Sequence, residues 1–156
     1  MSRISRRVSR NRRKPMALVF WDTNLFIYLL EEHPAFGEQV RQLRLRMLAR
    51  GDGLATSALT IGEVLVGPVR VRNDAVYKQY LSMFSQPQIR VLKFDLEAAG
   101  HYAYIRQDKS IQSPDAIQLA CAASAGIDLF ITNDDRLSRK NIPGINFITS
   151  LARAPI

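Results

Sequence analysis

The sequence predicts an α/β protein built on a parallel sheet whose two faces are covered by helices. Short apolar runs rich in β-branched and aromatic residues alternate along the chain with longer segments of helical periodicity. The first run, residues 17–21, is apolar at five consecutive positions, which is typical of a strand buried on both faces. The length of 156 residues suits a single domain with its own core.

Five strands are expected from short apolar segments bounded by polar residues or turn formers and, at residues 89–94, from alternation of apolar and polar residues. They cover residues 17–21, 54–56, 89–94, 129–132 and 145–149. Because helical segments separate them, a sheet of about five parallel strands is the expected topology.

Six helices are expected from apolar residues at helical spacing and from the breakers that follow them. They cover residues 23–32, 35–50, a third helix from Ser57 or Thr60 up to Gly67-Pro68, and residues 73–84, 96–107 and 113–124. Gly67-Pro68 is expected to stop the third helix, and Gly126 to follow the end of the sixth.

The net charge of +8 is concentrated in an N-terminal arm, residues 1–15, ahead of a domain at 16–156. The arm holds seven of the 22 basic residues and none of the 14 acidic ones, so the rest of the chain has a net charge of only +1. A like-charged segment with few large apolar residues is expected to be disordered on its own. The sequence leaves three interpretations open: a segment that binds nucleic-acid phosphates, a short transit peptide, or residues ahead of a true start at Met16.

Cysteine content and hydropathy indicate in which cellular compartment the protein is expected. Cys121 is the only cysteine, which excludes an internal disulfide and fits a reducing compartment such as the cytoplasm. No apolar run approaches the ~20 residues of a membrane span, so no membrane association is expected. The arm also lacks the apolar segment of a secretory signal.

Four acidic residues follow the ends of predicted strands or begin the helices after them, where ligands bind in open parallel sheets. They are Asp22, Glu63, Asp115 and Asp134. Each also has a structural explanation. Asp22 and Asp115 suit the starts of helices, Glu63 suits a capping box with Thr60, and Asp134 suits a turn.

Together the four acids favour a cation site. If all strands are parallel, the carboxylates lie at one edge of the sheet, and carboxylates about 5 Å apart repel by roughly 3 kcal/mol per pair at an effective dielectric near 20. Ligation by oxygen alone suits hard ions such as Mg²⁺ or Mn²⁺. Zinc is not expected, because Cys121 is solitary and neither His33 nor His101 has a partner at ligand spacing.

Four motifs occur in a fixed order along the chain. They are Asp22-Thr23-Asn24, Glu63-Val64-Leu65-Val66-Gly67, Asp115-Ala116 followed by Leu119-Ala120, and Thr132-Asn133-Asp134 ahead of Leu137. The acids are separated by 41, 52 and 19 residues. In these motifs and spacings the chain from Ala17 to Ser150 resembles a PIN domain, most closely the toxin ribonucleases of VapC type. The arm departs from that pattern, in which the chain starts almost directly at the first strand.

The resemblance implies an α/β/α sandwich with a central parallel sheet and an endoribonuclease that depends on Mg²⁺ or Mn²⁺. Cleavage would leave a 5′-phosphate and a 3′-hydroxyl. Asn24 and Thr132 would support the site, and Asp135 is an alternative for the fourth acidic position. The residues that would catalyse hydrolysis and hold the metal are Asp22, Glu63, Asp115 and Asp134.

The same resemblance implies partners. The protein would act on RNA as the toxin of a type II toxin–antitoxin pair, with a cognate antitoxin and a second copy of its own chain as partners. Basic residues near the expected rim of the site are candidates for RNA contacts, although a solvated surface is their usual fate. They are Arg106, Lys109, Arg136, Arg139 and Lys140.

Three other classes share part of the pattern. A haloacid-dehalogenase-type phosphatase needs a second acid two residues after Asp22, where this chain has Asn24. A response-regulator receiver needs an acidic pair near the first strand, where only Asp22 is present. A non-catalytic PIN scaffold that binds RNA or protein is the main alternative, and a titration with divalent metal would separate it from a nuclease.

Overall fold

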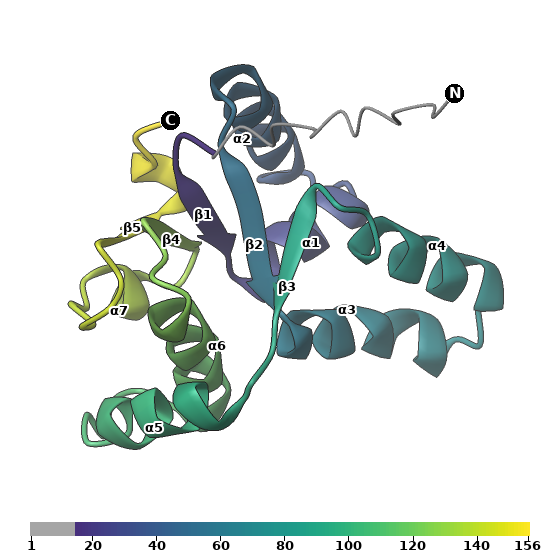
Figure 1. The fold of residues 1–156 in the computed structure, drawn as a ribbon. Coiled ribbons are helices and arrows are strands. Elements are labelled where there is room, and N and C mark those ends of the chain that lie inside the picture. The colour runs from purple at the N-terminus through teal and green to yellow at the C-terminus, as the bar shows by residue number, and fades with distance from the viewer. Residues whose placement is uncertain (1–14) are drawn as a thin grey trace, which may run out of the picture.

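The computed structural model describes residues 15–156 and is organised around one sheet of five parallel strands (Figure 1). The strand order is β3-β2-β1-β4-β5, so the chain builds one half of the sheet outward from β1 and then crosses to the other side of β1. The carboxyl ends of all strands share one edge, with the topological switch between β1 and β4. The strands are β1 (Leu18–Trp21), β2 (Gly53–Ser57), β3 (Ile89–Leu92), β4 (Leu129–Thr132) and β5 (Phe147–Ser150).

Helices cover both faces of this sheet (Figure 1), which confirms the predicted α/β/α fold. Predicted ends lie within two residues of the observed ends for every predicted element except the third helix. The helices are α1 (Thr23–Leu30), α2 (Gly37–Arg50), α3 (Ala58–Arg70), α4 (Asp74–Phe84), α5 (Leu96–Ile105), α6 (Ser113–Ser124) and α7 (Asp135–Ser138), followed by a 3-10 turn η1 (Leu151–Arg153).

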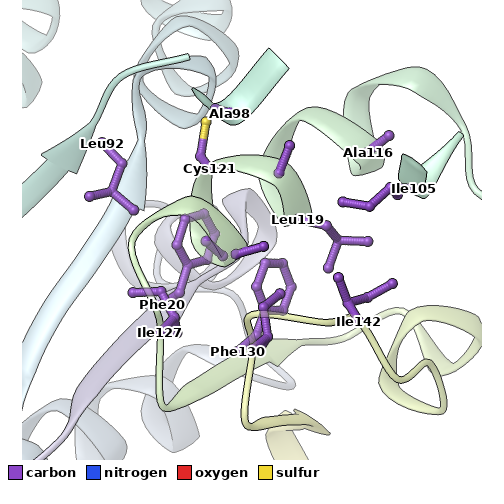
Figure 2. Packing of buried hydrophobic residues seen from close by; sticks show 14 of the residues in the cluster. Phe20, Leu92, Ala98, Ile105, Ala116, Leu119, Cys121, Ile127, Phe130 and Ile142 are labelled. Atoms are coloured by element: carbon purple, nitrogen blue, oxygen red, sulfur yellow. The ribbon is translucent and has the colours of Figure 1, made fainter. Parts of the chain in front are cut away.

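The core has one layer on each side of the sheet because alternate residues of a strand point to opposite faces. Phe20 of β1 faces α5 and α6, and its ring stacks on Phe130 of β4 at a centroid distance of 4.7 Å. Figure 2 shows this pair beneath Leu119 of α6. Val19 and Trp21 face the other way and pack with apolar residues of α1 to α4. A strand buried on both faces is what residues 17–21 predicted.

The third helix differs from its prediction. Helix α3 continues through Gly67-Pro68 to Arg70 rather than stopping there. Pro68 is buried on the same helical stripe as Thr60 and Val64, which lie eight and four residues earlier. Proline removes one amide donor from the helix, but the ladder resumes at once, since the Val71 amide donates to the Gly67 carbonyl at 3.2 Å. Packing of the proline ring on the core therefore overrides the local stop signal.

Two short elements were not predicted. The Asp134-Asp135 segment, expected to be a turn, starts the one-turn helix α7, and η1 follows β5. Within residues 15–156, no helix combines the length and the apolar character that crossing a bilayer requires. Residues 1–14 of the basic arm lie outside the described part of the chain.

Candidate active site

Asp22 lies at the switch point of the sheet, directly after β1, and is buried with 7% of its surface exposed. One carboxylate oxygen, Oδ1, accepts the Thr23 amide at 2.8 Å and thereby caps α1. The other, Oδ2, accepts the Thr132 hydroxyl from the end of β4 at 2.8 Å. The cap that was the structural alternative for Asp22 is therefore real, and it coexists with a position at the carboxyl edge of the sheet.

The environment of Asp22 opposes its ionisation. Burial is the main cause that raises the pKa of Asp22 to about 6, and the hydrogen bonds from Thr132 and Thr23 offset part of that effect. The negative charges of Asp115 and Glu63 raise the pKa further. Three of the four acids thus act on one another electrostatically.

Glu63 does not form the capping box that was its structural alternative. Helix α3 begins at Ala58, so Glu63 lies in its second turn and Thr60 lies inside the helix. The exposed Glu63 side chain turns instead toward α1, where its Oε1 accepts the Thr23 hydroxyl at 2.9 Å. This hydrogen bond joins Thr23 of the first motif to Glu63, the first residue of the second motif.

Asp115 stands in the first turn of α6 and is partly buried. Burial raises its pKa, and the negative charges of Asp134 and Glu63 add to the rise, while Arg136 opposes it. A lone acid in a first turn would gain from the helix dipole. The raised pKa shows that burial and neighbouring acids outweigh that gain.

Asp134 is the N-cap of α7, and its Oδ1 accepts the Arg136 amide at 2.9 Å. Its Oδ2 lies 3.2 Å from the Arg136 guanidinium, and this hydrogen bond is the main cause that lowers the pKa of Asp134. Asp135 is exposed on α7, and the negative charge of this segment that raises the pKa of Asp115 is that of Asp134.

The four acids match a hard cation in chemistry, since all donors are carboxylate oxygens at mutually repelling positions. Within residues 15–156, however, no three acid, histidine or cysteine side chains converge closely enough to hold an ion as they stand. Glu63 is turned to Thr23, and Asp134 is turned to Arg136. Binding an ion therefore requires Asp134 to leave Arg136 and the carboxylates to move closer together, whereas Glu63 can keep its Oε1 on Thr23 and present Oε2.

A buried polar network lies between α1, α3 and α6, and sequence reasoning missed it. Gln118 Nε2 donates to Thr23 Oγ1 at 3.0 Å and to Thr60 Oγ1 at 2.8 Å. Ser57 donates its hydroxyl to Gln118 Oε1, and Thr56 Oγ1 lies 2.8 Å from Thr60 Oγ1. All five side chains are buried.

One sequence signal pointed to this network. Gln118 is the only strongly polar residue in the otherwise apolar run 116–123. Buried polar groups need hydrogen-bond partners, so a glutamine on the inner face of a helix predicts a polar neighbour, although not which one.

The two predicted supporting residues differ in their surroundings. Thr132 is fully buried, and its hydroxyl bonds Asp22. Asn24 is exposed on the first turn of α1. Asn133, which follows Thr132 in the last motif, donates to the Tyr28 hydroxyl at 3.0 Å and so links the end of β4 to α1.

Most of the predicted RNA-contacting residues already have partners. Arg106 donates to the Ile111 carbonyl at 2.8 Å and braces the loop before α6. Lys140 pairs with Asp108 at 2.8 Å. Lys109 and Arg139 are exposed. A surface groove of about 490 Å³ beside α7 is lined by Ser110, Asp135, Arg136, Arg139 and Lys140.

The family model of the PIN domain matches residues 19–143, which span β1 to the segment before β5. The chain belongs to the PIN domain family. This confirms the resemblance drawn from the four motifs. No curated protein matches the chain.

Solved structures of other PIN domains are similar over most of the chain. A chain of VapBC2 from Rickettsia felis, bound to a DNA fragment from its promoter, is 18% identical with a TM-score of 0.67 and aligns over 85% of this chain and 98% of that one. A chain of DNA-bound VapBC from Salmonella typhimurium is 26% identical with a TM-score of 0.64, covering 87% and 99%. VapC20 of Mycobacterium tuberculosis, a toxin that cleaves the sarcin–ricin loop, is 16% identical with a TM-score of 0.59, covering 72% and 86%. These neighbours are members of VapBC toxin–antitoxin systems.

Proposed function

We propose that this PIN domain is an endoribonuclease dependent on Mg²⁺ or Mn²⁺ and acts as the toxin of a toxin–antitoxin pair. The observation that carries the proposal is electrostatic. Asp22, Glu63, Asp115 and Asp134 come from four different elements, the charges of Asp115 and Glu63 raise the pKa of Asp22, and those of Asp134 and Glu63 raise the pKa of Asp115. A scaffold without a ligand gains nothing from this repulsion, whereas a divalent cation relieves it.

The side chains of the site have separate roles in this proposal. Asp22, Glu63, Asp115 and Asp134 would hold the cation, which would supply an acidified water and stabilise charge on the scissile phosphate. Thr132 and the Thr23 amide keep Asp22 in one orientation through their hydrogen bonds. A carboxylate that is not fully engaged with the cation takes the proton of the attacking water. Hydrolysis leaves a 5′-phosphate and a 3′-hydroxyl.

Arg136 is the counter-ion of Asp134 in this structure. Its guanidinium pairs with Asp134 at 3.2 Å, and its charge also lowers the pKa of Asp115. For Asp134 to bind a cation, Arg136 must leave it. The released guanidinium then stands beside the groove near α7, where a phosphate of the RNA is a suitable partner.

The partners follow from the relatives. The Rickettsia felis and Salmonella typhimurium neighbours are VapBC complexes bound to DNA, which supports a cognate antitoxin for this chain. A homodimer and a cytoplasmic location belong to the same proposal.

Metal binding and cleavage test the proposal together. The full chain is titrated with Mn²⁺ by calorimetry and incubated with RNA in EDTA, in Mg²⁺ and in Mn²⁺. The expected result is saturable Mn²⁺ binding and cleavage that stops in EDTA and returns with either metal. Cleavage that persists in EDTA contradicts the metal mechanism, and a chain that neither binds Mn²⁺ nor cuts RNA is the non-catalytic scaffold.

A further inference from the structure

We propose that Gln118 is a positioning residue for the acidic site: it fixes the direction of the Thr23 hydroxyl and, through it, the orientation of Glu63. The inference rests on the proposed function, because its consequence is the affinity of the site for a divalent cation. Gln118 forms no hydrogen bond with the four acids and acts through Thr23.

The direction of each hydrogen bond follows from chemistry. Thr23 Oγ1 lies 2.9 Å from Glu63 Oε1, and a carboxylate can only accept, so the single hydroxyl hydrogen of Thr23 points at Glu63. Gln118 must then present its amide nitrogen to Thr23, as it does at 3.0 Å. The Ser57 hydroxyl donates to the amide oxygen of Gln118 and so keeps the amide nitrogen facing Thr23.

Burial makes the arrangement rigid. Gln118 is 1% exposed, and its nitrogen makes a second bond, to Thr60 Oγ1 at 2.8 Å. Both amide hydrogens and the amide oxygen are therefore used. If the amide were turned over, its oxygen would face Thr23 Oγ1, whose only hydrogen already points at Glu63, so two acceptors would oppose each other in a buried place.

Helix packing by itself does not call for this glutamine. Its neighbours Leu119 and Ala120 are fully buried in the core, and an apolar side chain at 118 would avoid the cost of burying an amide. The bonds of Gln118 instead lead to one exposed carboxylate, Glu63. With Oε1 held by Thr23, Oε2 of Glu63 is the oxygen left for a cation.

The expected loss of metal affinity follows from residues that hold metal ligands in place without binding the metal. Removing such a residue typically lowers metal affinity by about 10- to 100-fold. We expect Gln118→Met, which keeps the length and removes the amide, to bind Mn²⁺ about tenfold more weakly than the parent. Thr23→Val should lose a similar factor, and Thr23→Ser, which keeps the hydroxyl, should bind like the parent. Gln107→Met, at an exposed position just after α5, is the control and should bind Mn²⁺ like the parent.

The decisive measurement is the double variant. If Gln118 acts through Thr23, Gln118→Met in the Thr23→Val background causes no further loss of Mn²⁺ affinity. Independent losses that multiply in the double variant overturn the inference, as does a folded Gln118→Met protein that binds like the parent. Thermal melting in EDTA establishes which variants are folded.

Should Gln118→Met not fold, Gln118→Glu decides the question. It has the same shape and still accepts from Ser57, but it draws the Thr23 hydrogen away from Glu63. Its added negative charge by itself would strengthen Mn²⁺ binding, so weaker binding supports the inference and stronger binding overturns it. If the parent chain does not bind Mn²⁺, the proposed function is refuted. If the parent binds Mn²⁺ and loses affinity on Glu63→Gln but not on either Gln118 variant, only the role of Gln118 is refuted.

Discussion

Asp22 shows how one carboxylate can serve the fold and the site at once. It caps α1 through one oxygen and binds Thr132 through the other, and burial and two neighbouring acids raise its pKa to about 6. Cap and ligand are therefore not exclusive alternatives for the acids of this edge. What separates them is how each acid responds to pH, to neutralisation and to metal.

The pH dependence of metal-free stability tests the environment of Asp22. Because its folded pKa, about 6, lies above the ordinary value of 3.8, the folded state binds more protons between these pH values. As pH rises from about 4 to 6, ionisation of Asp22 therefore lowers the free energy of unfolding by up to about 3 kcal/mol. Asp22→Asn should remove this slope, measured as the difference between parent and variant in urea unfolding with EDTA at pH 4.5 to 7.5. Parallel curves would contradict the raised pKa.

Asp115 separates function from stability. As a member of a repelling cluster, Asp115→Asn should leave the metal-free melting temperature unchanged or higher, while Mn²⁺ affinity and RNA cleavage fall together, cleavage by about 10²-fold or more. A mere first-turn acid would instead lose a few tenths to ~1 kcal/mol and keep its activity. Asp74→Asn is a matched control, since Asp74 is exposed in the first turn of α4.

Arg136 should compete with metal for Asp134. Arg136→Gln removes the guanidinium that lies 3.2 Å from Asp134, so Mn²⁺ affinity, measured by calorimetry, should rise severalfold. Arg139→Gln is the control: it removes one positive charge from an exposed neighbouring position and so measures the effect of net charge alone on Mn²⁺ affinity. Equal affinities in the two variants would show that the ion pair has no specific effect on metal binding.

At the scale of the elements, two glycines differ in what their backbone allows. Gly144, ahead of β5, has a φ of +98°, and a Cβ placed there would lie 2.8 Å from the Ala123 carbonyl oxygen at the end of α6. Gly100 lies inside α5, where a Cβ would meet no atom within 4 Å. The first glycine lets β5 pass close to α6, and the second has no such role.

The two glycines should therefore respond in opposite directions to alanine. Gly144→Ala should cost about 1–3 kcal/mol, from the left-handed backbone and the contact with a carbonyl. Gly100→Ala should stabilise by up to ~1 kcal/mol, because alanine is the better helix former. Urea unfolding measures both, and a neutral Gly144→Ala would mean that the β5 approach relaxes without cost.

At the scale of the whole molecule, topology brings together acids that are far apart in sequence. The order β3-β2-β1-β4-β5 places β1 between β2 and β4. Asp22, Glu63 and Asp134 follow these three strands, and α6 brings Asp115 to the same edge. Charge is also divided at this scale, since the arm holds seven basic residues and the rest of the chain is nearly neutral.

That division of charge predicts a salt effect. If the arm binds phosphates, deleting residues 1–15 should weaken RNA binding and flatten its dependence on salt, because fewer counterions are released. The cleavage rate at saturating RNA should stay unchanged. The measurement is RNA affinity across a salt series for the full and shortened chains, and identical slopes would exclude phosphate binding by the arm.

The sequence by itself determined the class of fold and the order of its parts. Short apolar runs and helical periodicity depend on neighbours within a few residues, so β4 and α6 were predicted at their observed ends. The four acids were predicted from equally local features, because each follows the end of a predicted strand or lies in the helix after it. Local stop signals were weaker than packing at Pro68, where burial on the core carried α3 onward.

Only the tertiary structure decided which side chains face one another. Gln118 and Thr23 are 95 residues apart and meet because α6 and α1, on opposite faces of the sheet, both begin at its carboxyl edge. The pairing of Arg136 with Asp134, and the use of Arg106 on a loop carbonyl, likewise depend on rotamers and on contacts made after folding. A sequence pattern records the polarity of a residue. The partner that satisfies it is set by the packing of elements distant in the chain.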